Sequence, residues 1–220
     1  MNSLLRHIVR KIVYGTPAHR WLLAGAKHDK AYWDMELIGR LKPYLGGTLT
    51  IEARNVLTVT LMRRLIPGAK SLLDIGCASG SLLHCLGNDL RYVGVDISET
   101  AITEARHLLP GAEFHISALE EYEPSEEFDV MIMNEVLYYL SATAAAKQAR
   151  RYARHLRPSG GIIISMKHDA KSEAIFAEIG NHFIWIDGLL FQEKAARPEF
   201  RIRLDYARPA YLIGLFHPRS

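Results

Sequence analysis

Between residues 71 and 166 the sequence alternates short apolar runs with stretches that have a helical pattern. The runs are apolar almost throughout, which is typical of strands covered on both faces. They are SLLDIG (71–76), RYVGVDIS (91–98), AEFHIS (112–117), FDVMIMNE (128–135) and GIIISM (161–166). The helical patterns between them lie at about 79–87, 99–108 and 142–156. Strands that alternate with helices predict parallel βαβ units, and so an α/β fold with a doubly wound, mostly parallel sheet.

The pattern changes after residue 171, where a helix is predicted at 171–180. The segment HFIWIDGLLFQEK then places Asp187-Gly188 between two apolar runs, which predicts a hairpin turn. Two more strand-like runs follow in FRIRLDYARPAYLIGLF. We therefore expect an antiparallel C-terminal edge to the sheet.

The part of the chain before the first strand has helical patterns at 3–14, about 29–41 and about 51–65. No repeat or low-complexity linker interrupts the sequence. We expect an N-terminal helical extension or lid at 1–66 and one main domain at 67–220. The helix at 3–14 has one apolar and one basic face, so it either packs on the domain or makes peripheral contact with a membrane surface or partner.

Charge and cysteine content exclude several classes of protein. The net charge is +3, of which residues 1–30 carry +5, so a broad nucleic-acid surface on the main domain is not expected. Cys77 and Cys85 lack a CxxC spacing, which argues against a disulfide framework and a structural zinc. No signal-peptide pattern or membrane-spanning run is found, and we expect a cytoplasmic protein.

The first predicted strand ends on a carboxylate and passes into very small residues, in the order Asp74-Ile75-Gly76-Cys77-Ala78-Ser79-Gly80. A turn at the carboxyl end of a parallel strand lies where such sheets bind ligands. Glycine allows the tight turn and a close approach of the backbone. The spacing is not the G-x-G-x-x-G of dinucleotide loops. Asp74 would repel a pyrophosphate but would favour a cationic ligand without phosphate.

A second carboxylate, Asp96, ends the second predicted strand twenty residues after Gly76. A carboxylate at this place accepts hydrogen bonds from ribose hydroxyls. The feature therefore predicts a nucleoside without naming it, and an NAD-linked oxidoreductase remains an alternative.

The pattern D-x-G-x-A-x-G resembles motif I of class I S-adenosylmethionine (SAM) methyltransferases, with Ala78 in place of the middle glycine. FDVMIMNE, with its opening Phe-Asp pair, and RPSGG before the fifth strand resemble the same family, and EVLYYL (135–140) is similar to NodS-like small-molecule methyltransferases, which act on amino-sugar nitrogen. The resemblance covers about 70–166. It implies a Rossmann-like methyltransferase fold with a seven-stranded sheet, and SAM as cofactor with S-adenosylhomocysteine (SAH) as product.

The resemblance also implies which residues bind the cofactor, all of them at the carboxyl ends of strands. They are Asp74, Gly76, Cys77, Ala78, Gly80, Asp96, Ile97, Ser117, Ala118, Leu119, Asn134 and Val136. Ser117 stands where the family often has an aspartate facing the adenine amino group. Arg54 is a further candidate contact for the SAM carboxylate.

Catalytic candidates are His168 and Tyr138, and candidate substrate-binding residues are Tyr32, Trp33, Glu135 and Tyr139. An ordinary loop role for His168 and a packing role for the aromatic residues remain open. The metal-dependent catechol type needs an acid set with an Asp-Asn pair that is not found, so no metal is expected. We expect SAM-dependent methyl transfer to N or O of a small molecule or glycan precursor. A non-catalytic SAM-binding module is the other alternative, and the oligomeric state is left open.

Overall fold

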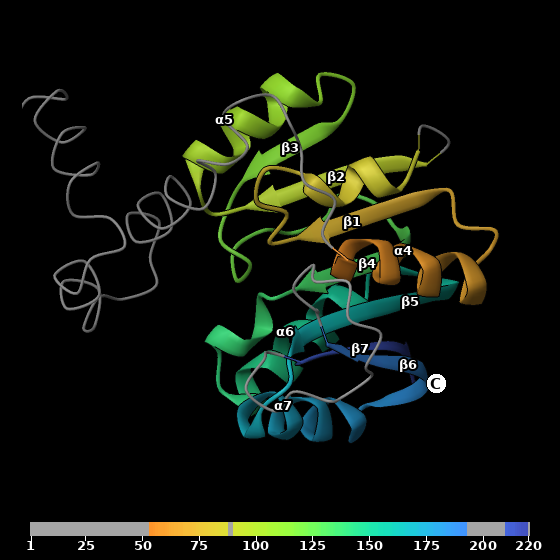
Figure 1. Ribbon diagram of the computed structural model, residues 1–220. Coiled ribbons are helices and arrows are strands. Elements are labelled where there is room, and N and C mark those ends of the chain that lie inside the picture. The colour runs from red at the N-terminus through yellow and green to blue at the C-terminus, as the bar shows by residue number, and fades with distance from the viewer. Residues whose placement is uncertain (1–52, 88–89, 193–209, 220) are drawn as a thin grey trace, which may run out of the picture.

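A computed structural model of the chain describes residues 53–87, 90–192 and 210–219. In these ranges seven strands form one sheet in the order β3-β2-β1-β4-β5-β7-β6 (Figure 1). The strands are β1 (Ser71–Ile75), β2 (Arg91–Asp96), β3 (Glu113–Ile116), β4 (Phe128–Asn134), β5 (Leu156–Lys167), β6 (Phe183–Gln192) and β7 (Ala210–Pro218). The helices are α4 (Ala53–Leu65), α5 (Glu99–Leu108), α6 (Ala142–Ala153) and α7 (Ala170–Gly180), with short 3₁₀ helices η1 (Ser81–Cys85) and η2 (Leu137–Tyr139).

The first five strands run parallel to one another: β1 pairs with β2 and β4, β2 with β3, and β4 with β5. Strand β7 pairs antiparallel with β5 and β6. The predicted mostly parallel sheet with an antiparallel C-terminal edge is therefore confirmed. From β1 the chain moves to β2 and β3 on one side and then to β4 and β5 on the other. The carboxyl ends of β1 and β4 thus form the switch point at which such sheets bind ligands.

Helices cover both faces of the sheet (Figure 1). On one face α4, α5 and η1 pack against the strands, and on the other face α6 and α7 do so. All five residues of β1 are buried as a result. This double cover explains why the strands read as unbroken apolar runs.

One carboxylate ties the amino end of β4 to the amino end of β1. Asp129 Oδ2 accepts hydrogen bonds from the backbone N–H groups of Lys70 at 2.8 Å and Ser71 at 2.9 Å. It also accepts from Ser71 Oγ and from Arg157 Nη1, each at 3.0 Å. The aspartate of the Phe-Asp pair therefore holds the amino-terminal edge of the sheet and lies away from the switch point.

The prediction of a helix at 79–87 is wrong in extent, because only η1 forms there. Left-handed glycines bracket the segment, with φ 77° at Gly80 and φ 78° at Gly87. A hydrogen bond to α4 also fixes the segment, since Asn55 Nδ2 donates to Ser81 Oγ at 3.0 Å. The segment is therefore a short turn fixed against α4.

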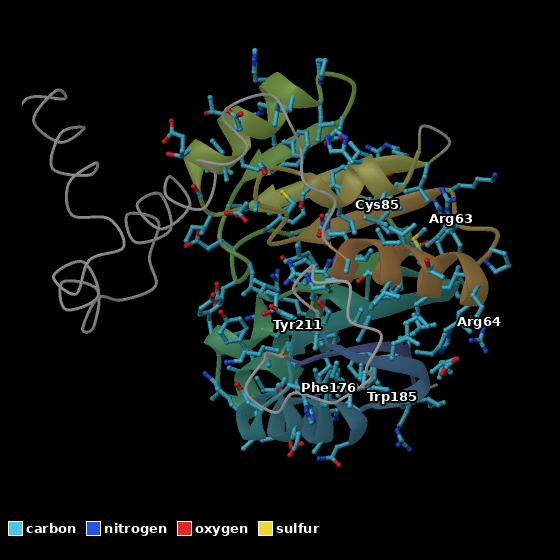
Figure 2. The ribbon with its side chains drawn as sticks, in the orientation of Figure 1. Arg63, Arg64, Cys85, Phe176, Trp185 and Tyr211 are labelled. Atoms are coloured by element: carbon cyan, nitrogen blue, oxygen red, sulfur yellow. The ribbon has the colours of Figure 1, made fainter. Side chains whose placement is uncertain are left out.

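The prediction of a hairpin turn at Asp187-Gly188 is wrong, because β6 continues through these residues with a register shift after Trp185. Gly188 pairs with Gly214 of β7, and a Cβ on either would come within 2.3 Å and 2.5 Å of the Trp185 ring. Figure 2 shows Trp185 close to Phe176 of α7, with ring centroids 5.7 Å apart. Gly188 and its β7 partner Gly214 therefore leave space for the Trp185 ring.

Helix α4 belongs to the predicted extension at 1–66, and it packs in the core with buried apolar side chains. The predicted helices at 3–14 and 29–41 lie outside the described residues, as do Tyr32 and Trp33. The boundary between extension and main domain stays a prediction. No helix in the described part of the chain has the length and apolar character needed to cross a membrane.

Candidate functional site

A cavity of about 760 Å³ lies at the carboxyl ends of the central strands. The loops that follow β1, β2, β3 and β4 line it, together with the start of α4 and Tyr211 of β7. Eleven of the twelve predicted cofactor-binding residues are among the lining residues. They are Asp74, Gly76, Cys77, Ala78, Asp96, Ile97, Ser117, Ala118, Leu119, Asn134 and Val136. The topology thus gathers in one place residues that span more than sixty positions of sequence.

The loop after β1 turns through three left-handed residues, with φ 77° at Gly76, 48° at Ala78 and 77° at Gly80. Gly80 shapes this turn but is not among the residues that line the cavity. At Gly76 a Cβ would come within 3.0 Å of Val136, and the N–H of Gly76 donates to Val95 O at 2.8 Å. The middle residue, Ala78, adopts the left-handed conformation despite its methyl group.

Asp96 meets this loop from the end of β2. Its Oδ2 accepts a hydrogen bond from the N–H of Ala78 at 2.9 Å, and its Oδ1 accepts from the N–H of Ser98 at 2.8 Å. These bonds orient the carboxylate at the cavity wall. Each oxygen of an ionised carboxylate accepts more than one hydrogen bond, so this group is chemically suited to ligand hydroxyls.

Asp74 lies behind the loop with 2% of its surface exposed. Burial raises its pKa to about 7, against a partial opposing effect of the Tyr92 hydroxyl, which donates to Oδ2 at 2.7 Å. The charge of Asp96 raises this pKa further. The sequence does not identify Tyr92 as a site residue, because it lies four positions before the end of β2 and belongs to no motif. A cation bound nearby would restore the ionised form of Asp74.

Beyond β4 the cavity is lined by polar and charged groups. Asn134 Oδ1 is buried and has no hydrogen-bond partner among the described residues. Glu135 adopts a left-handed conformation, with φ 55°, and its Oε1 lies 3.7 Å from Arg54 Nη1. The guanidinium of Arg54 lies 5.7 Å from the ring centroid of Tyr211, which Figure 2 shows at the start of β7. A strained residue beside a cavity is typical of a functional site.

Tyr138 and Tyr139 of η2 also line the cavity. Their ring centroids are 4.1 Å apart and their hydroxyls are hydrogen-bonded to each other. The two predicted residues therefore present a joint aromatic wall, with hydroxyl groups that can contact a polar ligand.

His168 is not among the residues that line the cavity. Its Nε2 lies 2.8 Å from Glu173 Oε1 of α7, whereas its chain neighbours Lys167 and Asp169 do line the cavity. Its role as a base stays a prediction, with its ring engaged by α7 in this structure. Within the described ranges no group of three or more His, Cys, Asp or Glu side chains could hold a metal ion.

Acidic side chains outnumber basic ones along the described cavity wall. The acids are Asp74, Asp96, Glu120, Glu135 and Asp169, and the bases are Arg54 and Lys167. Such a wall attracts cations and repels phosphates. The charge of the described cavity wall therefore favours a cationic ligand over one that carries phosphate.

Residues 73–163 match the family model described as "Methyltransferase domain". The chain is 29% identical over 135 residues to dTDP-3-amino-3,4,6-trideoxy-alpha-D-glucopyranose N,N-dimethyltransferase from Streptomyces venezuelae, covering 60% of this chain and 54% of that protein. It is 26% identical over 159 residues to trans-aconitate 2-methyltransferase from Acidovorax sp. (strain JS42), covering 69% and 61%. The chain thus spans less than two thirds of the length of these curated relatives.

Among solved structures, the fold is similar to that of the N-methyltransferase NodS from Bradyrhizobium japonicum WM9, which was solved with SAH. The TM-score is 0.64 and the sequence identity 19%, and the match covers 82% of this chain and 91% of that chain. The matched family model and this shared fold confirm the resemblance read from the sequence. Residues 73–163 thus match a methyltransferase domain, and the chain has a fold similar to that of the N-methyltransferase NodS.

Proposed function

We propose that this protein is a SAM-dependent methyltransferase that transfers a methyl group to N or O of a small molecule or glycan precursor. The observation that carries the proposal is the pair of carboxylates at the ends of β1 and β2. Asp96 is oriented by two backbone N–H groups toward the cavity, and Asp74 is buried behind a left-handed loop. The first suits a ribose, and the second suits a cationic, phosphate-free ligand.

In this proposal SAM lies with its ribose on Asp96, its adenine beside Ile97 and Ser117–Leu119, and its methionine end near Gly76 and Asn134. The buried Oδ1 of Asn134 would accept a hydrogen bond from the ammonium group. A buried acceptor without a partner costs about 1–3 kcal/mol, so a bound donor at this place would be favourable. The sulfonium cation would be attracted by the acidic wall.

The acceptor would bind beyond β4, against Glu135, Tyr138 and Tyr139. The predicted residues Tyr32 and Trp33 would complete this side. Methyl transfer is an in-line displacement, in which the enzyme mainly positions the two reactants and excludes water. An amine must arrive neutral, whereas a hydroxyl needs a base, for which Tyr138 and His168 are the candidates.

An amino sugar is the acceptor class that the relatives and the site favour together. The Streptomyces venezuelae relative is named as a sugar N,N-dimethyltransferase. In the chain itself, the Glu135 carboxylate lines the cavity and can accept a hydrogen bond from a neutral amino group, and the paired rings of Tyr138 and Tyr139 offer an aromatic wall for a sugar. We place the reaction in the cytoplasm, in keeping with two cysteines that lie outside any CxxC pattern.

Calorimetry on the full chain with SAM, SAH and NADH tests the cofactor. We expect SAM and SAH to bind and NADH not to bind. Binding of NADH without SAM would overturn the proposal in favour of an oxidoreductase. A mass-spectrometric screen with amino sugars and hydroxy acids then tests the acceptor. Tight SAM binding with no methylated product from any acceptor would instead indicate a non-catalytic SAM-binding module.

A further inference from the structure

The loop after β3 is held from its far side by the last turn of α6. The carbonyl oxygen of Leu119 accepts hydrogen bonds from the guanidinium of Arg151 and, at 2.8 Å, from the hydroxyl of Tyr152. The carbonyl oxygen of Tyr122 accepts from Arg151 Nη1 at 2.7 Å. Two consecutive residues of α6 therefore donate hydrogen bonds to two carbonyl oxygens of the loop that forms part of the cavity wall.

The side chains of Arg151 and Tyr152 are themselves held in place by further contacts. Tyr152 is fully buried, and the guanidinium of Arg151 lies 4.5 Å from the centroid of its ring. Arg151 also contacts Glu123 Oε2 at 2.8 Å and Gln148 Oε1 at 2.9 Å, which fixes its remaining donors. The position of the loop is thus determined by α6, which lies on the opposite face of the sheet from α4 and η1.

These hydrogen bonds determine which backbone groups of the loop remain available to a ligand. The carbonyl of Ala118 is taken by the N–H groups of Glu121 at 3.1 Å and Tyr122 at 3.0 Å. The carbonyl of Leu119 accepts from Arg151 and Tyr152. Within the part of the chain that the structure describes, the N–H groups of Ala118, Leu119 and Glu120 have no hydrogen-bond acceptor. The loop therefore offers backbone donors at the cavity, while its carbonyls are engaged elsewhere.

Ser117 adds an acceptor to these donors. Its hydroxyl donates to Ala118 O at 3.2 Å, so its lone pairs remain able to accept. Adenine presents an acceptor at N1 and a donor at its amino group, which matches this arrangement. A 6-oxopurine presents a donor at N1 and an acceptor at its oxygen, so two donors would face each other at N1.

We propose that Arg151 and Tyr152 are positioning residues that make the site select a 6-aminopurine over a 6-oxopurine nucleoside. The inference rests on the proposed function, because it assumes that the cavity holds the adenine of SAM or SAH. The two residues do not touch the base. They act by keeping the carbonyls of the loop turned away, so that only N–H groups and Ser117 meet the edge of the purine.

The experiment is calorimetric titration of the full chain with SAH and with its 6-oxo analogue, S-inosylhomocysteine. The wild-type protein should bind SAH at least about thirtyfold more tightly than the analogue. A loss of affinity of this size is typical when a ligand leaves buried polar groups unpaired. Arg151→Ala should reduce this ratio about tenfold, and Arg151→Lys should restore part of it. Tyr152→Phe should reduce the ratio about threefold, because Arg151 still holds Leu119 O. Arg150→Ala, an exposed change on the same helix, is the matched control and should leave the ratio unchanged.

A purely structural role would weaken both ligands equally, so an unchanged ratio in Arg151→Ala and Tyr152→Phe overturns the proposal. If Arg151→Ala does not fold, Arg151→Lys and Tyr152→Phe give the same decision. A wild-type protein that binds SAH and its analogue equally overturns the inference and leaves the proposed function standing. A wild-type protein that binds neither overturns both.

Discussion

Asp74 on β1 and Asp129 on β4 belong to paired, neighbouring strands, and their surroundings differ. Asp74 lies near the carboxyl end of its strand, is buried, and receives one side-chain hydrogen bond, from Tyr92. Asp129 lies at the amino end and accepts hydrogen bonds from Lys70, Ser71 and Arg157. Burial raises the pKa of Asp74 to about 7. Burial acts in the same direction on Asp129, but its hydrogen bonds outweigh it and lower the pKa.

The difference shows that aspartates at the two opposite edges of one sheet can have opposite effects on the stability of the fold. At the amino edge the carboxylate stabilises the fold, because every neighbour favours its charge. At the carboxyl edge the charge is disfavoured until a cation arrives, so the fold carries an energetic cost that a ligand can relieve. The four predictions that follow test this contrast, starting with the largest effect.

Asp96, the other carboxylate at the ligand edge, should have the largest effect on binding. Asp96→Ala should weaken SAM binding about 100-fold or more, since it removes two charged hydrogen bonds of about 1.5–3 kcal/mol each. Calorimetry measures the change, and circular dichroism verifies that the variant is folded. Asp129→Ala is the control and should leave SAM affinity within about twofold. Near-normal SAM affinity in Asp96→Ala would mean that the ribose is held elsewhere.

Asp74→Asn should stabilise the ligand-free protein at pH 8 and have little effect at pH 4. The folded protein holds the Asp74 proton up to pH about 7, whereas the unfolded chain releases it near the ordinary value of 3.8. Because the folded state binds more protons in this window, the wild-type free energy of unfolding falls as the pH rises through it. The gain at pH 8 is at most about 4 kcal/mol, at about 1.4 kcal/mol for each pKa unit.

Urea unfolding of wild type and Asp74→Asn at several pH values measures this difference. The asparagine keeps an acceptor for the Tyr92 hydroxyl, so it is a conservative change. Parallel stability curves of the two proteins between pH 4 and 8 would show that Asp74 is ionised without cost, and the contrast with Asp129 would be lost. The same variant should bind SAM more weakly than wild type, since it lacks the charge that attracts the cation.

Asp129→Ala should lower the free energy of unfolding by about 2–3 kcal/mol at pH 7, because it leaves the backbone N–H groups of Lys70 and Ser71 without their acceptor and removes the charge partner of Arg157. Urea unfolding is the measurement, and Asp129→Asn should recover part of the loss. A change below about 0.5 kcal/mol would place this carboxylate among ordinary surface residues.

The smallest effect is expected at Ala78. A left-handed alanine costs about 1–2 kcal/mol, and glycine loses about 0.5–1 kcal/mol more backbone freedom on folding. Ala78→Gly should therefore raise stability by about 0.5–1 kcal/mol and leave SAM affinity unchanged. Gly76→Ala is the opposite control, since its methyl group would press on Val136 at 3.0 Å. A loss of stability in Ala78→Gly would mean that the methyl group makes a favourable packing contact.

Much of the fold could be predicted because its signals are local. The apolar runs mark β1 to β4 within about two residues but only the C-terminal half of β5, and the helical patterns mark α5, α6 and α7. The errors arose where tertiary contacts decide the conformation. Asp187-Gly188 has the sequence of a turn, but it pairs with β7, where Gly188 and Gly214 leave space for the Trp185 ring. The segment at 79–87 is bracketed by two left-handed glycines and fixed by a contact with α4.

The candidate site follows the same division. Residues at the ends of strands could be named from the sequence, because parallel strands deliver their carboxyl ends to one edge. Tyr92, Arg151 and Tyr152 could not, because each contacts its partner across 18 to 33 positions of sequence. His168 follows the correct strand, yet its side chain pairs with Glu173 on α7.

The sequence by itself determined the alternation of strands and helices, the left-handed glycine loop and the carboxylates at the ends of the first two strands. These depend on local periodicity and on spacing along the chain. Only the tertiary structure decided that burial raises the pKa of Asp74, that Asp129 is stabilised as an anion, and that Arg151 and Tyr152 of α6 donate hydrogen bonds to the loop after β3. The physical reason is that burial, charge and hydrogen bonding depend on which distant residues surround a group, and those neighbours exist only in the folded chain.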